Sequence, residues 1–143
     1  MTRTERKANR EAGFTLLEML VVLAIMGLLA AIVAPQVMKY LGTSKTQTAK
    51  VQVQNITSAL ELYRLDVGRY PSTDEGLTSL VTAPGAAPGW NGPYLKKASA
   101  LKDPWDQPYI YRNPGQHSEV DVLSLGSDKA EGGAGEAADV GNW

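Results

Sequence analysis

Hydrophobic residues gather in one long run near the start of the chain. Residues 14–34 read FTLLEMLVVLAIMGLLAAIVA, and Glu18 is the single ionisable residue in that run. A helix over this stretch would be roughly 31 Å long, close to the hydrocarbon thickness of a bilayer, which is about 30 Å. The pattern therefore predicts a helix that can span a membrane.

The pattern changes after Pro35, which we expect to kink or interrupt the helix locally. Apolar residues then recur at alternating spacings of three and four, which is typical of an amphipathic helix with one apolar stripe. The stripe consists of Val53, Ile56, Leu60, Tyr63 and Val67. This face should pack on a small globular domain. Gly68 supplies a C-cap and Pro71 prevents continuation, so the helix should end near Asp66.

Turn signals divide the rest of the chain into short elements. Residues 72–75 read STDE, a capping box that predicts a short helix with Leu77, Leu80 and Val81 facing inward. Partial alternation over residues 109–111 and 120–125 predicts two or three antiparallel strands, joined by a turn around residues 113–115. We therefore expect an α+β fold, in which a long N-terminal helix with a hydrophobic first half packs on a small antiparallel β-sheet.

Composition excludes several classes of function. The chain has 143 residues and a formal net charge of -1 at pH 7, and it shows no clustered basic surface, which argues against a nucleic-acid binder. It contains no cysteine, so disulfides, thiolate metal sites and thiol nucleophiles are excluded. His117 is the one imidazole and lies in an expected hairpin turn, and no G-x-S-x-G motif is present. We therefore predict no catalytic residues and no enzymatic activity.

A basic leader precedes the apolar run. Residues 1–13 read MTRTERKANREAG, with four Arg or Lys against two Glu. On composition alone, the two segments fit an uncleaved signal anchor, a conventional signal peptide, or a leader that is removed before the apolar run. A carboxylate such as Glu18 costs about 2.5 to 3.5 kcal/mol at mid-bilayer, which marks it as a functional candidate unless it snorkels into the headgroups.

The junction of the two segments, GFTLLE at residues 13–18, resembles the type III signal of the type IV pilin and pseudopilin superfamily. That signal has Gly, then Phe or Met, then Glu at the fifth mature position. The resemblance implies cleavage after Gly13 by a prepilin peptidase, N-methylation of Phe14, and a role in assembly for Glu18 as the partner of a neighbouring amino terminus. It divides the chain into a leader at 1–13, a transmembrane and assembly helix at 14–35, and a periplasmic domain at 36–143.

Four later blocks resemble the major pseudopilins of type II secretion systems. They read RYPSTDEGL, DPWDQPYIY, PGQHSEVDVLSLGSD and, at the end of the chain, DVGNW. The resemblance implies a pilin-like fold and the role of major structural subunit of the pseudopilus, polymerising through its hydrophobic helix to drive export of folded proteins across the outer membrane. A type IV pilin, a minor pseudopilin and a single-pass membrane-anchored calcium-binding module are the alternatives.

The same resemblance implies partners and a location. The partners are further copies of the chain in a helical homopolymer, minor pseudopilins, the prepilin peptidase, and an inner-membrane assembly platform powered by a separate ATPase. The location is the Gram-negative inner membrane, with a single pass and the C-terminal domain in the periplasm. After assembly the chain would lie in the periplasmic pseudopilus.

The C-terminal loop is acidic and rich in glycine. Residues 128–139 read DKAEGGAGEAAD, with four carboxylates and one Lys. Taken alone, this composition favours a solvated loop, although oxygen ligands on a flexible loop also suit Ca²⁺. The resemblance to major pseudopilins implies one calcium ion in this loop. The implied ligands are the Leu125 carbonyl, Asp128 and Asp139, with Ala130, Glu131 and Glu136 as secondary candidates.

Overall fold

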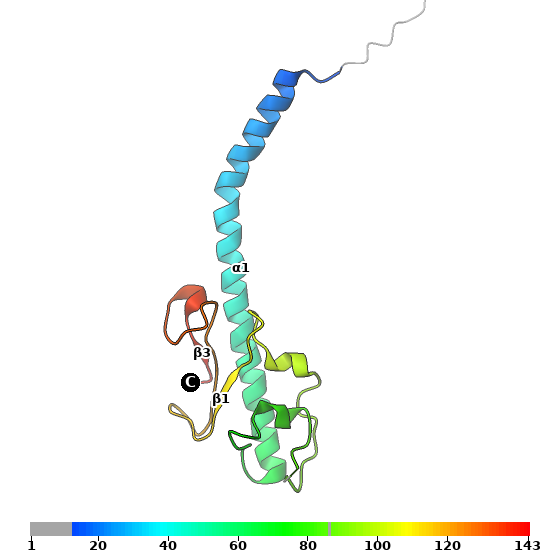
Figure 1. The fold of residues 1–143 in the computed structure, drawn as a ribbon, viewed down its shortest axis with the longest axis vertical. Helices are drawn as coiled ribbons and strands as arrows, with labels where there is room; N and C mark the ends of the chain where they lie inside the picture. Colours follow the sequence, from blue (N-terminus) through cyan, green and yellow to red (C-terminus); the bar gives the residue numbers. More distant parts are fainter. Residues whose placement is uncertain (1–12, 86) are drawn as a thin grey trace, which may run out of the picture. The chain divides into compact units, whose positions relative to one another are not determined.

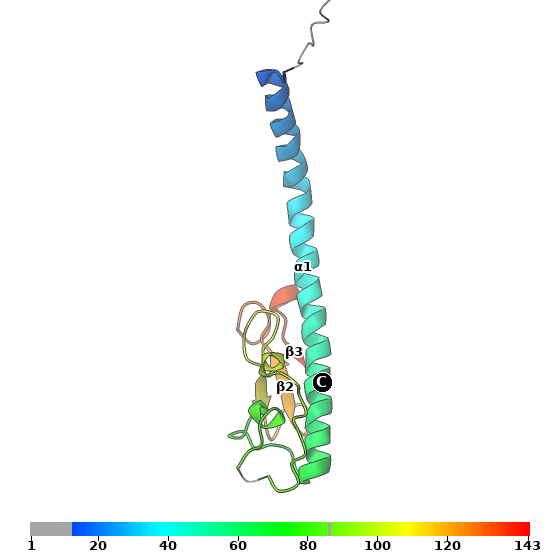
Figure 2. The same ribbon diagram turned by 90° about the vertical axis from the view of Figure 1, so that its right-hand side faces the viewer.

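A computed structural model describes residues 13–85 and 87–143, which form two compact units (Figures 1 and 2). The first unit is Met1–Met38 and the second is Lys39–Trp143. Apart from Gly13, the predicted leader lies outside the described residues. The helices are α1 (Leu16–Val67) and the short 3₁₀ turns η1 (Leu77–Leu80), η2 (Ala98–Leu101) and η3 (Gly135–Ala137), and the strands are β1 (Ile110–Arg112), β2 (Asp121–Ser124) and β3 (Val140–Gly141).

Helix α1 is continuous across Pro35, so of the two expected effects, a kink or an interruption, the interruption is absent. Proline already has a helical φ and removes a single backbone donor, which a long helix can tolerate. The helix begins where the Thr15 hydroxyl accepts a hydrogen bond from the Glu18 N–H at 3.2 Å. It ends at Gly68, which has a φ of 84° and donates its N–H to the Arg64 carbonyl at 2.8 Å. The predicted glycine C-cap is confirmed.

The core of the second unit lies between the C-terminal part of α1 and the segments that follow it. The predicted stripe is confirmed, since Val53, Ile56, Leu60 and Tyr63 are buried and Val67 packs against them while partly exposed. Leu80, Tyr109, Val122 and Val140 face this stripe from other segments. Figure 2 shows the sheet lying alongside this part of the helix. Truncating Leu60 to alanine would cost about 2 to 5 kcal/mol of stability.

The sheet contains three antiparallel strands in the order β1-β2-β3. Tyr111 pairs with Val122, and Ser124 pairs with Val140. All four residues of β2 are buried, because this strand has a neighbour on each side. The predicted α+β fold with a small antiparallel sheet is therefore confirmed.

The predicted capping box forms after the end of α1. The Ser72 hydroxyl accepts the Glu75 N–H at 3.2 Å, and Glu75 accepts the Ser72 N–H at 2.8 Å. Arg69 donates two hydrogen bonds to Glu75, at 2.6 and 2.8 Å, and these bonds lower the pKa of this carboxyl to about 2. The helix that follows is a single 3₁₀ turn, η1. Leu77 and Leu80 are buried as expected, whereas Val81 is only partly buried because it caps that turn.

Candidate functional site

The first candidate site is the apolar part of α1 within the first unit. Every described residue of this unit is exposed, and α1 is the one helix among the described residues that is long and apolar enough to cross a membrane. Leu16 and Leu23, for example, are 90% and 71% exposed. Apolar surface on this scale is costly in water and requires a bilayer or other protein chains to cover it.

The predicted processing residues lie at the start of this helix. Gly13 and Phe14 are exposed and precede the first helical turn, and Phe14 is 75% exposed. No described atom lies within 4 Å of the place that a Gly13 Cβ would occupy. Glu18 lies in the first turn of α1 and is also exposed. The junction is therefore accessible to an enzyme, and the Glu18 side chain is accessible to another chain.

The second candidate site is the acidic loop, which folds back on itself between β2 and β3. The Ser127 N–H donates to the Glu136 carbonyl at 2.9 Å and brings the two ends of the loop together. Gly126 has a φ of 67°, and a Cβ at this position would lie 2.6 Å from the Glu136 carbonyl oxygen and 2.9 Å from that of Ala138. Only glycine fits this conformation and this close approach.

Asp128 and Asp139 stand at opposite ends of this loop. Asp128 is exposed, and its Oδ1 accepts the Ala130 N–H at 3.1 Å. Asp139 Oδ2 accepts the Gly132 N–H at 2.9 Å, whereas Asp139 Oδ1 is buried and has no hydrogen-bond partner among the described residues. A buried carboxylate oxygen without a donor is costly, and a bound cation would remove that cost.

The two secondary carboxylates are engaged elsewhere. Glu131 accepts a hydrogen bond from Arg112 at 2.8 Å, in an ion pair whose carboxylate is 71% exposed. The Glu136 side chain lies against Gly42 of α1, where any Cβ would overlap its carboxylate. Within the described part of the chain, no three acidic or imidazole side chains converge on a common point. A metal in this loop would therefore also need carbonyl oxygens, such as those of Leu125 and Ala130.

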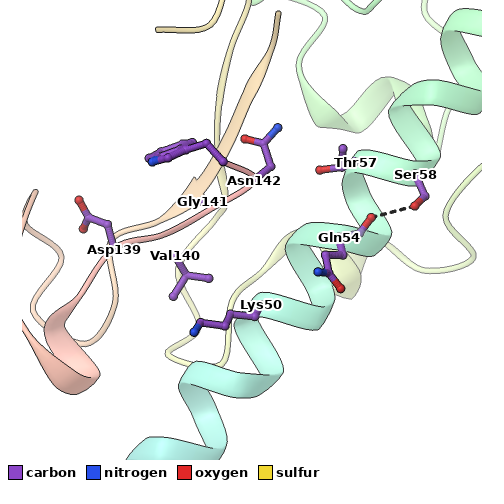
Figure 3. A pocket seen from close by; sticks show the side chains of 9 residues that line it. Lys50, Gln54, Thr57, Ser58, Asp139, Val140, Gly141 and Asn142 are labelled. Atoms are coloured by element: carbon purple, nitrogen blue, oxygen red, sulfur yellow. Dashed lines mark hydrogen bonds between the residues drawn. The ribbon is translucent and has the colours of Figure 1, made fainter. Parts of the chain in front are cut away.

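A groove of about 990 Å³ lies beside Asp139, between α1 and the C-terminal strand (Figure 3). Lys50, Gln54, Thr57 and Ser58 line it from α1, and residues 139–143 line it from the opposite side. Figure 3 shows the Lys50 and Gln54 side chains on the helix across from Val140. This lining contains no imidazole or thiol, and its one carboxylate side chain, Asp139, belongs to the acidic loop.

The hairpin between β1 and β2 is held by a buried carboxylate, Asp121. It accepts hydrogen bonds from the backbone N–H groups of Gln116 at 2.6 Å, His117 at 3.1 Å and Ser118 at 3.0 Å. Burial raises the pKa of Asp121, but the three backbone donors and the His117 side chain together outweigh burial and lower the pKa to about 2. The Ser118 hydroxyl donates to the Val120 carbonyl at 2.6 Å, and the His117 ring stacks on Trp143. His117 Nδ1 also lies 3.3 Å from Asp121 Oδ2, and the Ser118 hydroxyl lies 3.2 Å from Asp121 Oδ1. Asp121 therefore orders a turn. The Ser118 hydroxyl bonds Val120 and Asp121 and not the His117 ring, so no Ser-His-Asp relay forms here.

Because Asp121 is stabilising only when it is ionised, we expect the folded protein to lose stability in acid. In the folded protein the pKa of Asp121 lies below the usual value of about 3.9. Its contribution to the free energy of unfolding is therefore present above pH 4 and is lost as the pH falls towards 2. The expected loss is about 2 kcal/mol, with a further loss from Glu75, whose pKa is lowered in the same direction. Urea unfolding at pH 5 and pH 2, followed by tryptophan fluorescence, measures it. Asp121→Asn should be less stable at pH 5 and should lose less between the two pH values; an equal loss would contradict this role.

Comparisons with known proteins cover nearly the whole chain. Residues 36–143 match the family described as type II secretion system (T2SS), protein G, and residues 8–34 match the prokaryotic N-terminal methylation motif. A type II secretion system core protein G from Pseudomonas aeruginosa is 46% identical over 139 residues, which cover 94% of this chain and 96% of the relative. The Vibrio cholerae protein of the same name is 41% identical over 141 residues, covering 96% and 95%.

A solved structure is also similar. The crystal structure of the major pseudopilin from the type 2 secretion system of enterohaemorrhagic Escherichia coli has a TM-score of 0.62 and 32% sequence identity. The match covers 74% of this chain and 92% of that chain. The likeness therefore extends to the arrangement of the long helix and the small sheet.

Proposed function

The chain belongs to the type II secretion system protein G family, and we propose on this basis that cleavage after Gly13 prepares α1 for pseudopilus assembly while a calcium ion orders the acidic loop. The protein is a major pseudopilin, a structural subunit that polymerises and is processed by a prepilin peptidase, and it is not an enzyme. The predicted family, function and pilin-like fold are confirmed, and the major pseudopilin is selected over the type IV pilin and minor pseudopilin alternatives.

The exposed apolar surface of α1 is the main support for the proposed assembly into a filament. As the hydrophobic N-terminal helix of a Gram-negative pseudopilin, α1 is consistent with anchoring in the inner membrane. We propose that residues 14–35 form a single pass there, with residues 36–143 in the periplasm. On assembly, the helices of other copies would replace lipid around the same surface, because both surroundings are apolar. The subunit would then become part of the periplasmic pseudopilus.

Processing would create a positively charged amino terminus that guides the move of α1 from lipid into the filament. Cleavage after Gly13 leaves Phe14 as the new amino terminus, which we propose is N-methylated and stays cationic. Glu18 lies about one helical turn further on and is exposed. Each Glu18 would pair with the amino terminus of a neighbouring subunit, since an uncompensated charge among apolar helices is costly.

Family membership also supports the remaining partners. We propose that minor pseudopilins join the polymer and that an inner-membrane assembly platform extracts each subunit from the bilayer. The hydrophobic helix and the exposed Glu18 are the features of this chain that such a platform would handle.

Calcium binding is supported by Oδ1 of Asp139, which is buried and has no hydrogen-bond partner in the described part of the chain. The residues fit the ion, because hard carboxylate and carbonyl oxygens on a glycine-rich loop are what Ca²⁺ prefers. Asp139, Asp128 and the Leu125 carbonyl are the proposed ligands, and the Ala130 carbonyl is a further candidate. Glu131 and Glu136 would first have to leave Arg112 and Gly42, so we favour a set completed by water instead.

Removal of calcium should destabilise the second unit. Binding to the folded state alone contributes RT ln(1 + [L]/Kd), about 2.7 kcal/mol when free calcium is about 100 times Kd. The measurement is a thermal melt of the processed protein in detergent, with Ca²⁺ or with EDTA. Tryptophan fluorescence reports the second unit alone, because Trp90, Trp105 and Trp143 all lie there. Magnesium should substitute poorly, because it demands a tight octahedral site.

Asp128→Ala provides the variant for this melt. It should respond to calcium much less than the wild type, because one of the two proposed carboxylate ligands is gone. Asp74→Ala is the matched control, since Asp74 is an exposed carboxylate outside the loop. A wild-type midpoint that EDTA leaves unchanged, or equal responses from wild type and Asp128→Ala, would refute the proposed site.

A further inference from the structure

We infer that Asp103 and Ser124 are positioning residues for the calcium loop, forming a buried relay that sets the direction of the Leu125 carbonyl. This inference rests on the calcium function proposed above. Asp103 and Ser124 are 5% and 1% exposed, and they come from the turn before β1 and from the last position of β2. Neither belongs to the acidic loop, and neither is among the proposed ligands.

The Asp103 carboxylate is fixed on one side by its own turn. Its Oδ1 accepts the backbone N–H groups of Trp105 at 3.0 Å and Gln107 at 2.8 Å. Its Oδ2 accepts the Ser124 hydroxyl at 2.5 Å. Hydrogen bonds to an ionised acceptor are short and strong, so Asp103 determines where the Ser124 hydroxyl proton points.

The Ser124 oxygen then holds the first peptide of the loop. Because its one proton is donated to Asp103, the oxygen faces the loop as an acceptor, and it accepts the Gly126 N–H at 3.1 Å. This N–H belongs to the same planar trans peptide as the Leu125 carbonyl, so the two groups point in opposite directions. Anchoring the N–H therefore directs the Leu125 carbonyl away from Ser124.

The same anchor fixes how the two ends of the loop meet. Gly126 is buried and lies against the Glu136 and Ala138 carbonyls, while the Ser127 N–H binds the Glu136 carbonyl. Asp128 comes directly after Ser127 in the chain, and Asp139 comes directly after Ala138. The relay thus lies at the base of the loop, where a rigid peptide reduces the cost of assembling ligands from both ends.

The test is the calcium Kd of the processed protein in detergent, measured by calorimetry at a temperature where each variant gives a folded tryptophan signal. Ser124→Ala removes both hydrogen bonds of the hydroxyl, and it should weaken calcium binding by about tenfold to a hundredfold, as loss of groups behind metal ligands does. Asp103→Asn turns a donor towards Ser124 and should weaken binding in the same way. In the double variant the two effects should not multiply, because they interrupt one relay.

Asp121→Asn is the matched control, since Asp121 is an equally buried carboxylate that orders the hairpin instead of the loop. It should lower the melting midpoint in EDTA while leaving the calcium Kd unchanged. A wild-type Kd in Ser124→Ala or Asp103→Asn, or an equal weakening in Asp121→Asn, would overturn the relay alone. A wild-type protein that binds no calcium would instead overturn the proposed calcium function on which the relay depends.

Discussion

Glu18→Ala is expected to abolish filament growth while leaving cleavage after Gly13 largely intact. Removing one member of a charge pair in apolar surroundings strands the other charge, at a cost of about 3 to 5 kcal/mol. Such a cost would weaken each subunit addition by more than about a hundredfold. Glu18 is exposed, and the N–H that caps the start of α1 through Thr15 belongs to its backbone, which alanine keeps, so folding of the subunit should not suffer.

The measurement is the amount of sheared filament from cells that overproduce the protein, together with the amino-terminal sequence of the membrane form. Glu18→Gln is the informative companion, since it keeps the shape of the side chain and removes its charge. Both variants should start at Phe14 and yield no filaments. Normal filaments from Glu18→Ala would refute the pairing role and favour a carboxylate that merely reaches the headgroups.

Gly13→Val is expected to stop processing almost completely. Under the proposed processing, the peptidase recognises the glycine directly before the scissile bond, and a branched side chain should not fit there. Among the described residues, no atom lies within 4 Å of the added Cβ, so the substitution should not act by a clash with this part of the chain. The precursor should therefore accumulate in the membrane, and without a new amino terminus it should not assemble.

Immunoblots of membranes separate the precursor from the shorter mature form. Gly27→Val is the matched control: Gly27 is exposed within α1 with no described atom near its own Cβ position, and it lies well away from the junction. This control should be cleaved normally. A Gly13→Val protein that still begins at Phe14 would exclude Gly13 as the recognised residue.

The long helix and its apolar stripe could be predicted because they depend on repeating local patterns. The buried face of the helix follows from apolar residues at helical spacing, namely Val53, Ile56, Leu60 and Tyr63, and needs no knowledge of tertiary contacts. The capping box and the Gly68 cap likewise depend on residues that lie close together in the chain.

Other features arise from contacts between distant segments and leave no such pattern. Strand β3 contains two residues, and its place is set by pairing with β2, so alternation could not locate it. Asp103 and Asp121 are buried carboxylates whose donors are backbone N–H groups of turns, and a hydropathy pattern counts such residues as surface. The pairing of Glu131 with Arg112, 19 positions away, was equally invisible.

The sequence predicts the two candidate sites in different detail. The junction at Gly13 and Phe14 consists of consecutive residues, so the sequence alone is enough to predict it. The acidic loop contains several carboxylates of similar chemistry. Only the folded chain shows that one Asp139 oxygen has no partner among the described residues while Glu136 faces α1.

The central claim is that cleavage after Gly13 prepares the subunit for assembly. The intact mass of the protein purified from membranes tests this claim most directly. Cells that supply a prepilin peptidase should yield a single species with the mass of residues 14–143 plus one methyl group. This mass would establish both the cut after Gly13 and the modification of Phe14. A species with the mass of residues 1–143, or one that begins at any other residue, would contradict the processing on which assembly depends.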